Sequence, residues 1–221
     1  MPDKPNAEQL IKRLQTLENK RATWLALWND VADYVMPERG PFLGDITPGS
    51  ERYDKMFDST APDALERLAA AMQGELTNPA QQWFGLTARG LPEEMNQSKE
   101  VKDWLEEVAE EIMAAYNRSN QPQILHEVFY DLAGFGISTL YQEEEKDETG
   151  ELNFLAFNLS EVHIAENAQG RIDTIFRKFR YTARQAFEVW GDLLPEKIVR
   201  DAKKEPENEH LFLHAVLPTP D

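Results

Sequence analysis

The chain has 221 residues, of which 40 are Asp or Glu and 23 are Lys or Arg, so its formal net charge is −17. This excess of carboxylates disfavours tight binding to DNA or to an anionic membrane. With 41% hydrophobic residues the composition excludes disorder of the whole chain, and the absence of cysteine excludes disulfides, thiolate metal sites and cysteine nucleophiles. No run of about 18 apolar residues offers a membrane span, which indicates synthesis in the cytoplasm.

The first part of the chain is predicted to be helical. Apolar residues spaced by three and four predict one long amphipathic helix from Asn6 to Val35, which Pro37 ends. After a loop rich in Pro and Gly, the same periodicity and local capping signals predict three further helices. These run from about Ala61 to Leu76, from Ser98 to Tyr116 and from Asn120 to Gly136. In the second of them we expect Trp104 on the apolar face and the glutamates opposite, and between the first two we expect a short buried strand or turn at Trp83–Leu86.

The periodicity then changes from helical to alternating. Two hairpins are predicted, one from Ile137–Glu143 and Leu152–Asn158, the other from Val162–Glu166 and Arg171–Tyr181. Together they would form a small antiparallel sheet. Thr182 and Gln185 fit a capping box that opens a short helix, and Pro195 starts another. Leu211–Val216 would be a last strand with no visible partner downstream, which suggests that the chain is a fragment of a longer one.

These elements predict an α+β fold in which long helices pack with a small antiparallel sheet. We expect a single body over residues 1–221. Residues 1–136 would be mainly helical, residues 137–181 would form the hairpins, and residues 182–221 would contain short helices and the terminal strand.

No set of residues indicates catalysis, a cofactor or a metal. His210 and His214 are four residues apart, but the sequence between them favours a strand, where their side chains lie too far apart to share a metal. A carboxylate-dependent hydrolase that uses the cluster Glu106–Glu111 is the weakest alternative, because no histidine accompanies these residues and such a cluster usually only solvates a helix face. The expected protein is therefore not an enzyme.

One predicted strand carries both cations and aromatic residues, the composition of a nucleic-acid stacking platform. Alternation along the strand, however, sends Arg177 and Phe179 to one face and Phe176, Lys178 and Arg180 to the other. Because the aromatic residues do not share a face, we expect core packing with charged edges.

Several ordered motifs together resemble the N-terminal part of the head-to-tail connector, or portal, proteins of short-tailed bacteriophages. They are WNDVADYVMP from Trp28, FDSTA from Phe57, LAAAMQGELTNP from Leu68, QWFGL from Gln82, VKDWL, SNQPQILHEVFYDLAGFGISTLY and FRYTARQAFEVWG. Each motif alone is weak, but their order covers essentially the whole chain.

The resemblance implies a non-enzymatic ring, usually of twelve subunits, at one capsid vertex of the virion. Terminase would drive double-stranded DNA through this ring without specific binding, and capsid and tail proteins would be its other partners. The resemblance also implies that these residues form the outer, wing-like α+β region, whereas family members are much longer than this chain.

A closed ring needs a heterologous interface between copies. The length of the first helix makes Trp24 and Trp28 our candidates for part of that interface. The alternative to a portal subunit is a free-standing adaptor with an acidic surface that mimics DNA.

Overall fold

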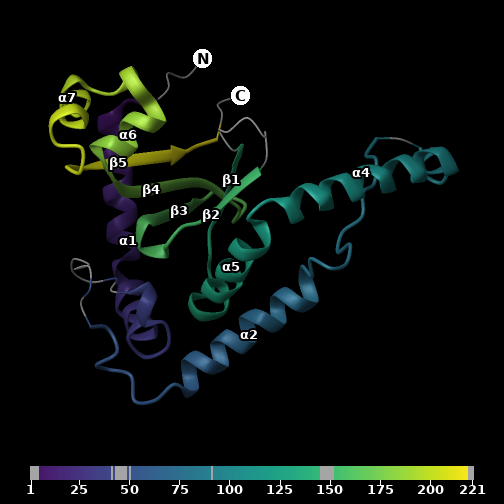
Figure 1. Cartoon of the computed structure of the whole chain (residues 1–221), viewed down its shortest axis with the longest axis horizontal. Helices are drawn as coiled ribbons and strands as arrows, with labels where there is room; N and C mark the ends of the chain where they lie inside the picture. Colours follow the sequence, from purple (N-terminus) through teal and green to yellow (C-terminus); the bar gives the residue numbers. More distant parts are fainter. Residues whose placement is uncertain are drawn as a thin grey trace. The chain divides into compact units, whose positions relative to one another are not determined.

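The computed structural model describes residues 5–40, 42, 49, 51–90, 92–144 and 152–218, apart from the side chain of residue 93. Helices and antiparallel strands follow the predicted order, and the α+β class is confirmed (Figure 1). Contacts group the chain into two compact units. Unit 1 contains residues 1–25 and 159–221, and unit 2 contains residues 26–158. The expectation of a single body stays a prediction.

Helix α1 (Ala7–Tyr34) contributes to both units, because the boundary falls inside it, between Leu25 and Ala26. It matches the predicted first helix to within a residue at each end. A 3₁₀ turn, η1 (Pro37–Arg39), follows it as the proline predicts.

Three further helices of unit 2 have the predicted positions: α2 (Thr60–Leu76), α4 (Lys99–Arg118) and α5 (Gln121–Phe135). The short helix α3 (Glu93–Asn96) was not predicted. The hydroxyl of Ser98 accepts a hydrogen bond from the amide of Val101 at the start of α4, and Gly136 ends α5 in the left-handed region at φ 74°. Ser59, in contrast, does not cap α2 with its side chain. Local capping chemistry therefore fixes some helix ends, and not all.

Helices α2 and α5 form the core of unit 2 and run side by side (Figure 1). Ala69 of α2 packs with Leu125 and Phe129 of α5, and all three are buried. At Gly134, α5 packs closely against the segment that follows α1, because a Cβ atom there would collide with the buried side chain of Met36. The small side chains at these positions are what allow the close packing.

Unit 2 also contains a two-stranded antiparallel sheet of β1 (Leu140–Glu144) and β2 (Leu152–Ala156). This confirms the first hairpin, although its predicted acidic tip includes residues 145–151, which lie outside the described residues. Asn120 joins α5 to the hairpin. Its side-chain amide accepts a hydrogen bond from the Phe154 amide at 2.8 Å and donates one to the Phe154 carbonyl at 2.9 Å.

Unit 1 is built on a second sheet, with strand order β3–β4–β5. Its strands are β3 (Val162–Glu166), β4 (Ile172–Thr182) and β5 (Glu209–Val216), preceded by the turn η2 (Leu159–Glu161). One prediction was wrong here, because the two hairpins belong to two separate sheets. The last strand has its partner upstream in the chain, since β5 pairs antiparallel with β4 along its whole length.

Two groups of helices cover the two faces of the β4 strand. On one face, Arg13 of α1 donates to the hydroxyl of Thr174 at 2.8 Å, and Glu18 of α1 pairs with Lys178 at 2.9 Å. On the other face, Trp190 of α6 packs against Phe212, with ring centroids 5.0 Å apart. The latter helices are α6 (Ala183–Trp190), η3 (Gly191–Leu193) and α7 (Glu196–Lys204).

Two local predictions on and beside β4 are confirmed. Thr182 and Gln185 form the complete capping box of α6. The guanidinium of Arg177 lies 4.2 Å from the ring centroid of Phe179, so these residues share a face, and both Phe176 and Phe179 are buried. The aromatic residues of β4 therefore belong to the core rather than to a stacking platform.

Candidate subunit interface

The excess negative charge is confined to one unit. Unit 1 has 14 Lys or Arg and 14 Asp or Glu, whereas unit 2 has 9 Lys or Arg and 26 Asp or Glu. The whole net charge of −17 therefore belongs to unit 2. Because charges of one sign repel, two copies that met through unit 2 alone would be held apart.

The two candidate tryptophans have different surroundings. Trp24 belongs to unit 1 and is 55% exposed. Trp28 belongs to unit 2, is half-buried and lies 5.9 Å from the ring of Phe42, which in turn contacts Phe135 at 5.1 Å. The structure therefore puts Trp28 into an aromatic cluster of the core and leaves Trp24 at the surface.

Unit 2 exposes further apolar residues at the end of α1 that the sequence analysis did not single out. Leu27 and Tyr34 are both exposed, and the ring of Tyr34 stacks on the almost fully exposed Phe57 at 6.1 Å. Phe57 begins the motif FDSTA, and this motif is the feature of the sequence that could have pointed to it. Exposed aromatic pairs of this kind are typical of surfaces that meet another protein.

Helix α4 ends close to the start of α5, and the rest of α4 extends away from α5 (Figure 1). One side of α4 faces the segment after α2, which has no regular strand over residues 82–88, contrary to the prediction. Trp83 of this segment is partly exposed and stacks on Tyr116 at 6.2 Å.

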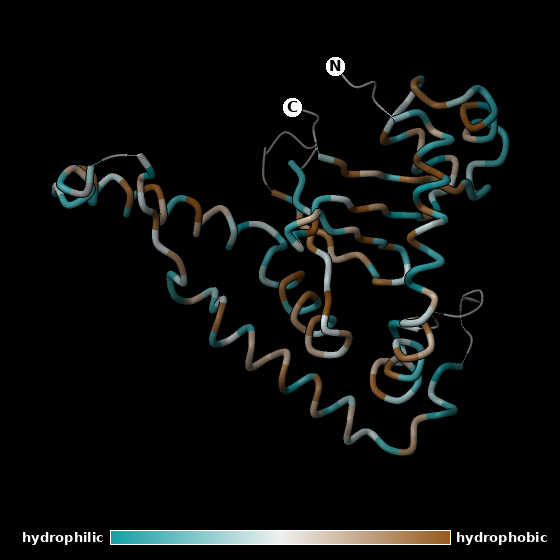
Figure 2. The backbone as a smooth tube through the Cα atoms, turned by 180° about the vertical axis from the view of Figure 1, so that it is seen from behind, coloured by the Kyte–Doolittle hydropathy of each residue, from teal (hydrophilic) through white to brown (hydrophobic). Residues whose placement is uncertain are grey.

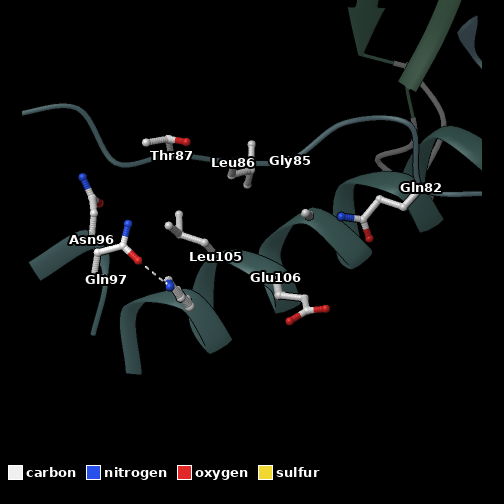
Figure 3. A pocket seen from close by; sticks show the side chains of 10 residues that line it. Gln82, Gly85, Leu86, Thr87, Asn96, Gln97, Leu105 and Glu106 are labelled. Atoms are coloured by element: carbon white, nitrogen blue, oxygen red, sulfur yellow. Dashed lines mark hydrogen bonds between the residues drawn. The ribbon is translucent and has the colours of Figure 1, made fainter. Parts of the chain in front are cut away.

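Between this segment and α4 lies an open groove of about 380 Å³ (Figure 3). Leu86, Leu105 and Ala109 form its apolar part, and Lys102 donates to Gln97 at 2.6 Å along its rim. On this side, α4 is therefore covered by the segment that follows α2, with the groove between them.

The opposite flank of α4 is uncovered, and this corrects the prediction for Trp104. Its side chain is 60% exposed instead of lying on the buried face. Figure 2 shows hydrophobic residues recurring along α4 among hydrophilic ones, but only part of that apolar arc meets the rest of unit 2. Periodicity identifies the arc and does not say how much of it is covered.

A buried ion pair anchors the turn η1 in unit 2. The Arg39 guanidinium contacts the carboxylate of Asp131 on α5 at 2.7 Å and that of Glu127 at 3.3 Å. The side chain of Asp131 is almost completely buried, and burial outweighs the attraction of Arg39 and raises the pKa of this carboxyl to about 6. The pair therefore holds the turn in place, and the burial of the Asp131 carboxylate costs free energy.

Unit 1 has an arginine anchor of another kind. Arg21 of α1 donates to the backbone carbonyls of Leu159, Ser160 and Val162 at 3.0, 3.1 and 2.6 Å. Burial lowers the pKa of Arg21 to about 10. The neighbouring His163 is also buried, and burial together with the charge of Arg21 lowers its pKa to about 4. In unit 1 the buried arginine therefore donates to backbone carbonyls, which do not titrate. In unit 2 the buried arginine pairs with carboxylates, which do.

Neither arginine site has the features of a catalytic centre. Over the described residues, no three His, Cys, Asp or Glu side chains come close enough to hold a metal ion. His210 and His214 lie on strand β5, and the glutamates of α4 are spread around a helix whose surface is largely open. None of the described helices is sufficiently long and apolar to cross a membrane.

Known proteins identify the family. The model of the family "Bacteriophage head to tail connecting protein" matches residues 7–221. The chain is 30% identical over 192 residues to the "Probable portal protein" of Bordetella phage BPP-1, covering 86% of this chain and 34% of that protein. It is 30% identical over 185 residues to the "Portal protein" of Salmonella phage epsilon15, covering 83% of this chain and 33% of that protein. The chain thus spans about a third of the length of these relatives. It belongs to the family of bacteriophage head to tail connecting proteins.

Proposed function

We propose that the chain forms part of a portal subunit, which assembles with further copies into a ring at one capsid vertex of the virion. Double-stranded DNA passes through this ring during packaging and ejection, and the tail attaches to it. The observation that carries the proposal is the family match over residues 7–221, together with two relatives that are named as portal proteins.

In this function the chain has a structural role, and the chemistry of packaging belongs to the terminase. The subunit number is proposed to be twelve, and capsid and tail proteins are the other partners. The chain would correspond to the wing-like part of the subunit, with its long helices and small sheets.

The charge division is consistent with DNA that moves without sticking. A protein holds DNA by neutralising phosphates with Lys and Arg, and unit 2 has almost three carboxylates for each cation. We propose that unit 2 contributes a surface that repels DNA. Measuring DNA binding by the assembled protein at low salt tests this, because tight and strongly salt-dependent binding would contradict it.

Electron microscopy of the purified protein tests the portal function itself. A closed ring with a central channel is the expected result. A persistent monomer or dimer without a channel would favour the free-standing acidic adaptor, which no finding at present favours over the portal.

A further inference from the structure

We propose that the exposed flank of α4 in one copy binds the basic face of α7 in the neighbouring copy. The inference rests on the proposed ring, and it names a pair of surfaces that would join the copies. A ring with cyclic symmetry needs two different surfaces on each copy. The two helices supply such a pair, because each has an exposed face of one charge, with a large exposed apolar residue on that face in α4 and just before the helix in α7.

The surface on α4 is a stripe that runs along the helix. Its members are spaced by four, three and four residues, so they lie on one flank: Glu100, Trp104, Glu107 and Glu111. All four are exposed, and none makes a hydrogen bond or ion pair with another described residue. An exposed tryptophan is a typical anchor for a protein partner. Because carboxylates surround this one, the partner surface is expected to be cationic.

The helix itself shows that this charge is not compensated. Glu107 and Glu111 are one turn apart, as are Asp103 and Glu107, and like charges at this spacing destabilise a helix. Cations occur only towards the ends of α4, at Lys99, Lys102 and Arg118. A cationic partner at the middle of the helix would relieve this repulsion.

The complementary surface is found on α7, in which four of the nine residues are Lys or Arg. Lys197, Arg200 and Lys204 are spaced by three and four residues and share a face. Leu193, which precedes the helix, is 89% exposed and provides the apolar contact.

Two of these cations are available, in contrast to those of the neighbouring sheet, whereas Arg200 lies 3.6 Å from the carboxylate of the adjacent Asp201. In unit 1, Arg177, Lys178 and Arg180 each pair with a carboxylate of the same unit. Lys197 and Lys204 pair with none among the described residues. Contact between unit 2 of one copy and unit 1 of the next also avoids the repulsion of two units that each carry −17.

The natural absence of cysteine allows a direct test by cross-linking. Two variants, Glu107→Cys and Lys204→Cys, are mixed, assembled and treated with a short bis-maleimide cross-linker. We expect a cross-linked dimer that contains one of each variant. The matched control is Glu106→Cys, the adjacent residue on the groove side of α4, which should give at least about tenfold less product with Lys204→Cys.

A double variant with both cysteines separates the possible partners. Contact between copies gives a ladder of cross-linked oligomers, as the proposal requires. A cross-link within one chain would overturn it. So would a ring that forms without any cross-link at these positions, which would leave capsid or tail proteins as partners of the stripe.

Charge reversal provides a second readout. Glu107→Lys with Glu111→Lys should reduce the assembled fraction by about tenfold or more, and adding Lys197→Glu with Lys204→Glu should restore it. Failure of the restoration contradicts the proposed contact. If the unaltered protein forms no ring at all, the portal function fails; if it forms a ring that is insensitive to these changes, only this inference fails.

Discussion

Units 1 and 2 are stabilised by arginines of similar burial that have different acceptors. In unit 1, Arg21 donates to three backbone carbonyls, and in unit 2, Arg39 pairs with the carboxylates of Asp131 and Glu127. Unit 1 is neutral overall, whereas unit 2 carries the whole net charge of −17. The difference indicates that the acidity of the chain is a property of one region, and that this region still needs a buried cation.

The largest expected effect is the loss of either arginine. Arg39→Ala leaves the buried carboxylate of Asp131 without its partner, and Arg21→Ala leaves three carbonyls unsatisfied. Each should lower the free energy of unfolding by about 3 kcal/mol, measured by urea denaturation. The matched controls are Arg67→Ala in unit 2 and Arg184→Ala in unit 1, whose side chains are exposed, and these should cost less than about 1 kcal/mol. Equal losses for anchor and control would contradict the anchoring roles.

The two units should respond to pH in opposite directions. The pKa of Asp131 is raised to about 6 by burial, so its contribution to stability is complete below about pH 4 and is lost as the pH rises through 6. The pKa of His163 is lowered to about 4 by burial and by Arg21, so its contribution is complete above about pH 6.5 and is lost as the pH falls through 4.

Each response amounts to about 2 kcal/mol, and substitution separates them. Urea unfolding of Asp131→Asn and His163→Gln at pH 4.5 and 7 is the measurement. The first change should remove the gain in stability at acid pH, and the second should remove the loss. A pH profile that neither substitution alters would show that these groups are not responsible.

A glycine pair tests the close packing of unit 2. Gly134→Ala should cost about 2 kcal/mol, because the added Cβ collides with the buried Met36. Gly74→Ala is the matched control: it lies in the interior of α2 with nothing near its Cβ position, so it should stabilise the protein by about 0.5 kcal/mol. Thermal unfolding of both variants measures the difference, and a neutral Gly134→Ala would mean that α5 and Met36 are less closely packed.

The smallest effect on stability is expected at Trp24. Trp28→Ala removes a ring from the cluster with Phe42 and should cost about 1.5 kcal/mol. Trp24→Ala should cost less than about 0.5 kcal/mol, since this side chain is mainly exposed. If Trp24 is part of the subunit interface, as we propose, the variant should instead lower the assembled fraction. A stability loss at Trp24 without any effect on assembly would make it a core residue.

The sequence predicts local features well and pairing over long distances poorly. The capping box at Thr182 and the left-handed end of α5 at Gly136 depend on a few neighbouring residues, and both were found. The partner of β5 was missed because β4 and β5 are separated by two helices. For the same reason the two hairpins were assigned to one sheet, since alternation defines a strand's faces but not its neighbour.

The candidate surface shows a similar limit. Exposed Trp104 and half-buried Trp28 both lie in amphipathic helices, and their apolar periodicity does not distinguish them. What separates them is coverage by other elements, which depends on the fold. The charge division also became visible only with the boundary inside α1, a continuous helix without the Gly or Pro signals of a linker.

Native mass spectrometry of the purified protein tests whether its copies assemble into a ring. We expect one discrete, large homo-oligomer whose mass is a fixed multiple of the subunit mass, with twelve as the proposed number. A stable monomer or dimer at all protein concentrations would contradict the assignment to a portal ring.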